Sequence, residues 1–210
     1  MENIAEGIAV DIDEVLSQTA LFWMDIVNNK FGNSENLSST KLFKKYKLTK
    51  NVPGWQSVEI NDFLEGMRVS NEFYKDIPVI GNSVEYLNKI DKIIPVSCYL
   101  TIRPQVISNG TKKWLKDNGF PDREIIMKPN EIPTKDGNTW KVRILTSLYP
   151  NVSGIIDDNP EVADLLLSKN YKGIVFLYGY EKYHTDKIKV VPCKDWEDIF
   201  FEIKKMKKKL

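Results

Sequence analysis

Histidine and cysteine are scarce in this chain of 210 residues. The two cysteines, Cys98 and Cys193, lie far apart and outside any Cys-x-x-Cys pair, which argues against a disulfide framework and against a zinc site. The single histidine, His184, lies among polar neighbours and is interpreted as a loop residue. Any acid–base chemistry must therefore come from carboxylates or lysines.

Long apolar runs and a large net charge are also missing. No apolar run approaches the roughly 18 residues that a bilayer requires, and the N-terminus lacks the pattern of a signal peptide. The net charge of +1 gives no general attraction to nucleic acid or membrane, and the basic end at residues 204–210 is interpreted as a solvated helix terminus. We expect a cytoplasmic protein for which a membrane is excluded and nucleic acid is not favoured as a partner. A homodimer stays open.

Short apolar runs alternate with amphipathic segments from about residue 78 onward. This alternation is typical of βαβ units and a mostly parallel sheet. The expected strands after the first are "IIPVSCYL", "EIIM", "SGII" and "GIVFLYG". The expected helices are "NSVEYLNKI", "RPQVISNGTKKWLKDNG" with Pro104 in its first turn, "TWKVRILTSL", "NPEVADLLLSK" and "DWEDIFFEIKKM".

Residues 17–77 have a different character. They are helical in period and rich in aromatic side chains, with loops of Asn, Pro and Gly between the helices. We expect a helical insertion directly after a first strand that ends at "IAV". The predicted organisation is an α/β core domain, residues 1–16 and 78–210, with a small helical cap, residues 17–77.

Polar side chains follow three of the predicted strands. They are Asp11 and Asp13 after the first, Thr101 after the second, and Asp157 and Asp158 after the third. Because loops and helix N-termini converge at the carboxyl ends of parallel strands, these groups are expected at one sheet edge. Repulsion among the carboxylates calls for a cation, and an oxygen-rich donor set suits Mg²⁺.

Such a group has the parts that phosphoryl transfer requires. One aspartate could attack phosphorus as a nucleophile, and the aspartate two positions on could exchange a proton with the leaving oxygen and with water. The Thr101 hydroxyl and a lysine would stabilise the phosphoryl charge. Lys141, at the start of the helix before the third strand, is preferred as that lysine, and Lys128 is the alternative.

The motifs "IAVDIDEVL", "CYLTIRP", Lys141 and "GIIDDNP" resemble, in this order, the four motifs of the haloacid dehalogenase (HAD) superfamily of phosphohydrolases. The stretch "TIRPQVISNGTKKWLKDNGFP" is similar to the branch with the 5′(3′)-deoxyribonucleotidases. The resemblance covers residues 7–200. It implies a Rossmann-like, three-layer α/β/α core with a parallel sheet, and a helical cap inserted after the first strand.

The same resemblance implies a role for each motif residue. Asp11 would be the nucleophile and Asp13 the general acid–base, which favours a phosphatase over a dehalogenase. Thr101 would bind the phosphate, and Lys141 would neutralise it. The Mg²⁺ ligands would be Asp11, Asp13 through its backbone carbonyl, Asp158 directly, and Asp157 alongside it. Glu14 stands where many relatives carry Gly, and its charge could narrow the choice of substrate.

Four residues are candidates for binding the substrate. Ile102 and Arg103 follow Thr101, although an ion pair within the core domain is an equal alternative for Arg103. Phe22 and Trp23, in the helical insertion, could stack on a nucleobase. Most aromatic residues at helical spacing are simply core, so at most two of five are expected to touch substrate: Phe22, Trp23, Trp55, Phe63 and Tyr74.

These features predict a Mg²⁺-dependent phosphatase that hydrolyses a small phosphomonoester, such as a (deoxy)nucleotide 5′-monophosphate, through an aspartyl-phosphate intermediate. Two alternatives stay open. One is a phosphatase that processes nucleic-acid ends, because "KLFKKYKLTK" has five lysines, although such a run is usually a solvated face. The other is a non-catalytic HAD-like module that binds phosphate or protein.

Overall fold

The computed structural model describes residues 4–185 and 189–207; residues 208–210 of the basic C-terminal end lie outside this range. A six-stranded sheet with the order β3-β2-β1-β4-β5-β6 forms the centre, and all its strand pairs are parallel. The strands are β1 (Gly7–Val10), β2 (Val96–Pro104), β3 (Glu124–Lys128), β4 (Val152–Asp157), β5 (Ile174–Tyr178) and β6 (Lys189–Cys193). The order reverses between β1 and β4, where a sheet of this kind opens a crevice at its carboxyl edge.

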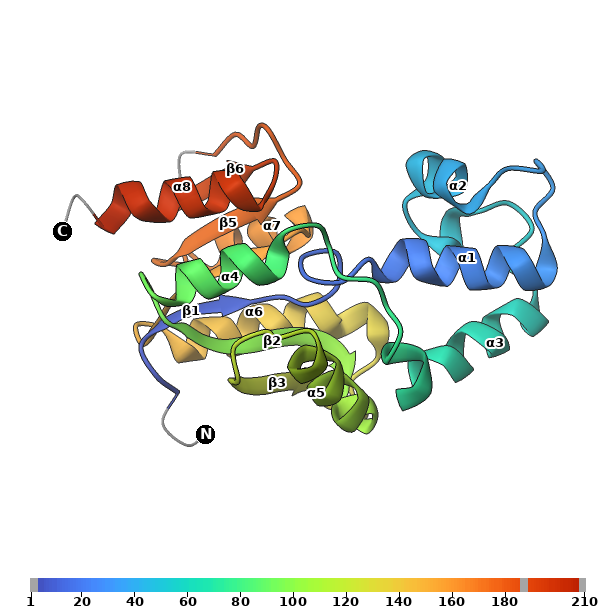
Figure 1. Cartoon of the computed structure of the whole chain (residues 1–210), viewed down its shortest axis with the longest axis horizontal. Helices are drawn as coiled ribbons and strands as arrows, with labels where there is room; N and C mark the ends of the chain where they lie inside the picture. Colours follow the sequence, from blue (N-terminus) through green and yellow to red (C-terminus); the bar gives the residue numbers. More distant parts are fainter. Residues whose placement is uncertain (1–3, 186–188, 208–210) are drawn as a thin grey trace.

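Helices cover both faces of the sheet (Figure 1). One face packs against α4 (Ser83–Asp91), α5 (Ser108–Asp117) and α8 (Trp196–Lys207). The other face packs against α6 (Gly137–Leu148) and α7 (Pro160–Ser168). The three layers confirm the predicted Rossmann-like α/β/α fold.

The first strand shows why the central strands are apolar throughout. Ile8 and Val10 belong to the cluster under α4, α5 and α8, whereas Ala9 belongs to the cluster under α6 and α7. Successive side chains of a strand point to opposite faces, and here both faces are buried. The chain therefore turns polar only where the strand leaves the sheet, at Asp11.

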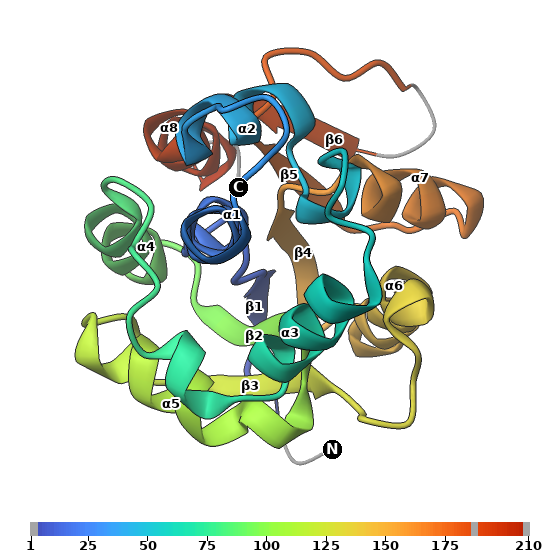
Figure 2. The same cartoon turned by 90° about the vertical axis from the view of Figure 1, so that its right-hand side faces the viewer.

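A helical segment leaves the sheet after β1 and returns before α4. This α1–α3 segment contains α1 (Thr19–Phe31), α2 (Ser39–Tyr46), α3 (Val58–Arg68) and the 3₁₀ turns Thr49–Asn51 and Asn71–Tyr74. It has its own apolar cluster, and the Trp55 indole donates a hydrogen bond to the Gly32 carbonyl. Figure 2 looks onto this segment, with the strands behind it. The division into a core domain and a cap stays a prediction.

The chain crosses between the sheet and the α1–α3 segment twice, at adjacent places. The Ile80 amide donates to the Leu16 carbonyl at 2.7 Å, and the Gln18 amide donates to the Pro78 carbonyl at 2.8 Å. Ser17 and Val79 form an antiparallel bridge between these bonds. The outgoing and returning chains are therefore a short, two-stranded connection.

Two parts of the sequence prediction differ from the structure. The helix expected from Pro104 begins only at Ser108, because β2 continues through Pro104 and a 3₁₀ turn, Gln105–Ile107, follows. A residue before proline avoids the α region, which keeps Arg103 extended. The edge strand β6 was not predicted. It contains Pro192, and a proline is tolerated in a sheet mainly at its edge. Within the described ranges, no helix is long and apolar enough to cross a membrane.

Leu87, which is fully buried between α4 and the sheet, tests this packing. We expect Leu87→Ala to lower the free energy of unfolding by about 3 kcal/mol, because the cavity adds to the lost transfer energy. Val58→Ala, at a residue that is 77% exposed, should change it by less than about 0.5 kcal/mol. Urea unfolding of both variants would measure the difference; equal effects would contradict the assigned core.

Candidate active site

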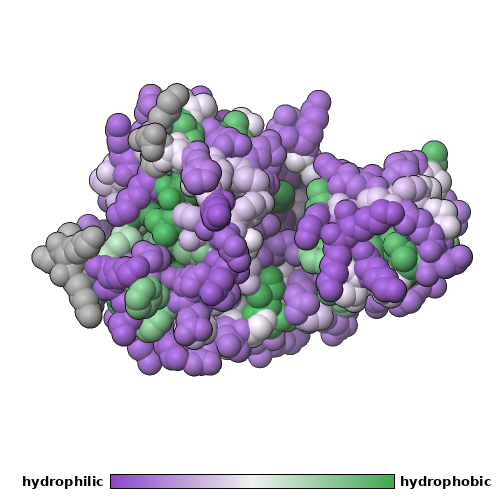
Figure 3. Space-filling model, turned by 90° about the horizontal axis from the view of Figure 1, so that it is seen from above, coloured by the Kyte–Doolittle hydropathy of each residue, from purple (hydrophilic) through white to green (hydrophobic). Residues whose placement is uncertain are grey.

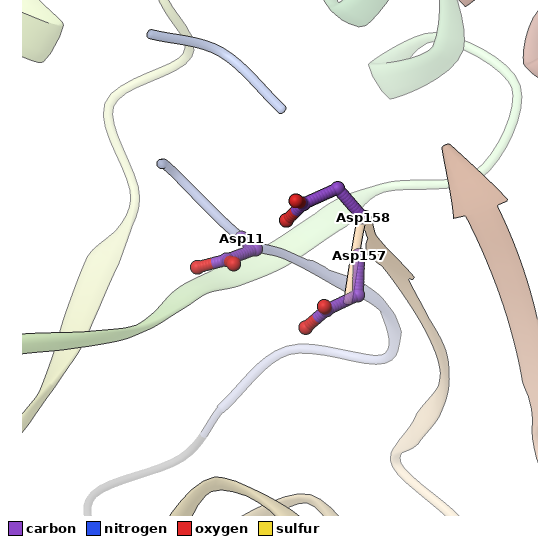
Figure 4. Close-up of side chains that lie close together, drawn as sticks. All are labelled: Asp11, Asp157 and Asp158. Atoms are coloured by element: carbon purple, nitrogen blue, oxygen red, sulfur yellow. The ribbon is translucent and has the colours of Figure 1, made fainter. Parts of the chain in front are cut away.

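Three carboxylates meet at the point where the strand order reverses. Asp11 directly follows β1, Asp157 ends β4, and Asp158 follows it. One ligand oxygen from each residue lies within 4.8 Å of the others. Figure 4 shows the three side chains projecting to the same side of the strand ends. The structure thus brings together three of the four predicted metal ligands.

A buried lysine neutralises part of this acidic cluster. The Lys141 Nζ, from α6, lies 2.8 Å from Asp11 Oδ2 and 2.9 Å from Asp157 Oδ2. The other oxygens of these carboxylates accept backbone hydrogen bonds, Asp11 Oδ1 from the Ile12 amide and Asp157 Oδ1 from the Asn159 amide. Both aspartates are therefore fixed on two sides.

Lys128, the alternative lysine, points elsewhere. It ends β3, and its Nζ donates to the carbonyl oxygens of Pro129 and Ile132. Between the two candidates that the sequence left open, the structure brings Lys141 to the acidic cluster.

The acidic cluster carries more negative than positive charge. Burial raises the pKa of Asp11 to about 7 against the opposing effect of Lys141, and burial with neighbouring carboxylates raises the pKa of Asp158 well above its usual range. Burial alone would lower the pKa of Lys141, but Asp11 and Asp157 raise it above its ordinary value. A divalent cation with a preference for oxygen ligands would supply the missing charge, so the residues present fit such an ion. Asp11 and Asp158 would hold it.

Asp13 lies outside this group of three carboxylates and pairs with Arg103. The Arg103 Nη2 donates to Asp13 Oδ1 at 2.7 Å, and its Nε donates to both carboxylate oxygens at 3.0 and 3.1 Å. The guanidinium is buried and lies over the Tyr74 ring, 4.6 Å from its centre. Burial alone would raise the pKa of Asp13, but the charge and hydrogen bonds of Arg103 lower it below its ordinary value. This ion pair is one of the two roles that the sequence left open for Arg103.

The remaining residues of the second motif lie along the end of β2. Thr101 is fully buried, and its hydroxyl accepts a hydrogen bond from the Arg103 amide at 3.2 Å. The parallel register that pairs Val10 with Tyr99 sets Thr101 beside the residues that follow β1. Ile102 packs at the start of α6, where an added Cβ on Gly137 would come within 3.2 Å of it. Phosphate binding by Thr101, Ile102 or Arg103 stays a prediction.

A cleft of about 590 Å³ opens beside the acidic cluster, between the α1–α3 segment and the ends of the strands. Its lining includes Asp158 and Glu14, Leu21 and Phe43 from the helices, and Tyr178 and Tyr180 from the end of β5. Figure 3 shows it as an indentation between the α1–α3 segment and the rest of the molecule. Burial raises the pKa of Glu14 to about 7.

The cleft is not lined by the aromatic residues that the sequence favoured. Phe22 and Trp23 pack instead against a cluster that includes Tyr74 and Ile77, and Trp55 belongs to the core of the α1–α3 segment. Binding of substrate by Phe22 and Trp23 stays a prediction. Neighbouring side chains of one helix point in different directions, and only packing shows which one faces the sheet.

Some of the residues that line the cleft could have been predicted from the sequence. "GIVFLYGY" is a predicted strand, and its Tyr178 and Tyr180 follow the same strand-end rule that identified the aspartates. Phe43 had no such signal, because it lies within a run of lysines.

Comparison with known proteins gives one informative similarity. No family model matches the chain. A protein of Oceanobacillus iheyensis named "Putative nucleotidase OB0422" is 28% identical over 130 residues. The match covers 60% of this chain and 62% of that relative, so it spans less than two thirds of the relative's length.

The pairing of Asp13 with Arg103 can be measured with a double-mutant cycle. We expect Arg103→Met to reduce the free energy of unfolding by about 3 kcal/mol, because it leaves a largely buried carboxylate without its partner. In the double variant with Asp13→Asn, the loss should be smaller than the sum of the single losses. Urea unfolding measures all four proteins; strictly additive losses would show that the two side chains do not interact.

The charge imbalance predicts how stability depends on pH in the presence of EDTA. Asp11 and Asp158 keep protons in the folded chain at pH values where the unfolded chain has released them, so stability should fall as pH rises from about 4 to about 7. Asp158→Asn removes one buried charge and should raise the melting temperature at about pH 7.5, and reduce the fall.

The exposed Asp62 of α3 provides the matched control, because Asp62→Asn removes a charge that water already solvates. Thermal unfolding across the pH range compares the three proteins. A lower melting temperature for Asp158→Asn than for the wild type in EDTA would contradict the imbalance.

Proposed function

We propose that this chain is a Mg²⁺-dependent phosphatase of the HAD type that hydrolyses a small phosphomonoester, with a (deoxy)nucleotide 5′-monophosphate as the favoured substrate. The observation that carries the proposal is the buried contact of Lys141 with Asp11 and Asp157, in an acidic cluster that opens into a cleft. The similarity to a protein named as a nucleotidase supports hydrolysis of phosphate esters. A cytoplasmic location belongs to the same proposal.

Asp11 is the proposed nucleophile. One of its carboxylate oxygens attacks phosphorus, the bond between phosphorus and the ester oxygen breaks, and the leaving oxygen takes a proton from Asp13. Water then attacks phosphorus of the aspartyl-phosphate, which releases inorganic phosphate and regenerates the carboxylate. Lys141 and the Ile12 amide hold Asp11 in place, so the nucleophile needs no reorganisation before attack.

Asp13 is the proposed acid–base residue, and its ion pair with Arg103 favours one of the two proton transfers. The pair lowers the pKa of Asp13 and so favours the ionised form, which can take a proton from the attacking water. Donation of a proton to the leaving oxygen requires the protonated form. Esters with a leaving group that is stable as an anion should therefore be the easiest substrates.

The metal would be held by Asp11 and Asp158, and its contribution when bound is to neutralise negative charge on the phosphoryl oxygens. Asp157 lies alongside these two carboxylates. Its two oxygens also accept hydrogen bonds from Lys141 and from the Asn159 amide, so it orients the lysine as well. The α1–α3 segment is the proposed cap, because it forms one wall of the cleft beside Asp158.

Hydrolysis of p-nitrophenyl phosphate tests the proposal, since its leaving group needs little help from a general acid. We expect activity with Mg²⁺, loss of activity in EDTA, and a fall of at least about a thousandfold in kcat for Asp11→Asn, which removes the nucleophile but keeps the shape. Asp62→Asn, on the exposed face of α3, should retain full activity. Equal turnover by Asp11→Asn and the wild type would refute the mechanism.

A further inference from the structure

Glu14 adopts a backbone conformation that a glutamate rarely takes. Its φ is 57°, in the left-handed region, where a side chain with a Cβ is strained by about 1 kcal/mol and glycine is not. The residue comes directly after Asp13 and is half-buried. Strain of this kind persists where the surrounding structure holds the residue for a purpose.

The Glu14 carboxylate is held at the start of α1 and faces the cleft. Its Oε1 accepts a hydrogen bond from the Ala20 amide at 2.6 Å, in the first turn of this helix. The side chain lines the same cleft as Asp158. A phosphate held at Asp11 and Asp158 would extend its ester group into this space, next to Glu14.

The rest of the cleft wall is mostly apolar. Leu21 and Phe43 on the helical side and Tyr180 on the sheet side offer apolar and aromatic surface. Lys47 is the cation among the lining residues within the described ranges, and it is exposed. The leaving group therefore meets apolar surface and a carboxylate, and a carboxylate accepts hydrogen bonds but repels anions.

We propose that Glu14 is the specificity-determining residue of this cleft, and that it selects phosphomonoesters with an uncharged leaving group that offers a hydroxyl or amino hydrogen. It rejects leaving groups that carry a second phosphate. This inference rests on the proposed function for the position of the reacting phosphate, and it goes beyond it by naming the class of leaving group and the residue that selects it.

Glu14→Gln separates the proposed selection of the leaving group from the structural contact with α1. The amide oxygen can still accept the hydrogen bond from Ala20, whereas the negative charge is gone and an N–H donor replaces part of the acceptor surface. Glu14→Ala loses both functions and shows how much the contact with Ala20 contributes to the melting temperature. Glu59→Gln, at an exposed residue of α3, is the matched control.

Binding is measured by calorimetry with Mg²⁺ at about pH 8.5, where Glu14 is ionised. The Asp11→Asn background is used so that turnover does not interfere. The ligand pairs are thymidine 5′-monophosphate with thymidine 3′,5′-bisphosphate, and glucose 6-phosphate with glucose 1,6-bisphosphate. We expect the monophosphate of at least one pair to bind at least about tenfold more tightly than its bisphosphate, because like charges are juxtaposed in the bisphosphate complex. Glu14→Gln should reduce this ratio to about threefold or less, and Glu59→Gln should leave it unchanged.

An unchanged ratio in Glu14→Gln, tighter binding of the bisphosphates, or no binding of any of the four ligands would overturn the role of Glu14. The proposed phosphatase activity is tested separately, by turnover of p-nitrophenyl phosphate with Asp11 intact. If that turnover is absent but the binding ratio responds to Glu14→Gln, the phosphatase proposal fails and the selection by Glu14 stands.

Discussion

The Lys141 ammonium holds together two strands that the chain reaches more than a hundred residues apart. Asp11 follows β1 and Asp157 ends β4, and the two carboxylates would repel each other without a cation between them. Burial makes this contact strong, because little water remains to screen the charges. The contact fixes one oxygen of Asp11 and one of Asp157, and Asp158 lies next to them.

The fold explains why these groups meet. The strand order reverses between β1 and β4, so the loops that follow the two strands separate and leave the carboxyl edge open there. α6 packs on one face of the sheet and delivers Lys141 to the same edge. The α1–α3 segment lies beyond the strand ends, at the right of Figure 1. The cleft beside Asp158 is thus bounded by rigid strands on one side and by helices on the other.

The sequence was most informative where local pattern and parallel topology act together. Asp11, Asp157 and Asp158 were predicted because polar residues that follow buried parallel strands lie at the carboxyl edge of the sheet. Lys141 was predicted from its position at the start of the helix before β4. Arg103 and the cleft were harder, because pairing with Asp13 and the orientation of Phe22, Trp23 and Phe43 depend on contacts between distant parts of the chain. Propensity alone also failed at Pro104, where β2 continues because Arg103 must stay extended.

The two-stranded connection at Leu16–Gln18 and Pro78–Ile80 makes the helical segment an insertion that begins and ends at one point of the sheet. The returning chain is also held away from this connection, because the Gly110 amide of α5 donates to Asn71 Oδ1 and the Arg103 guanidinium lies over the Tyr74 ring. A change of length within α1–α3 therefore leaves the strand register unchanged only if residues 71–74 keep these contacts.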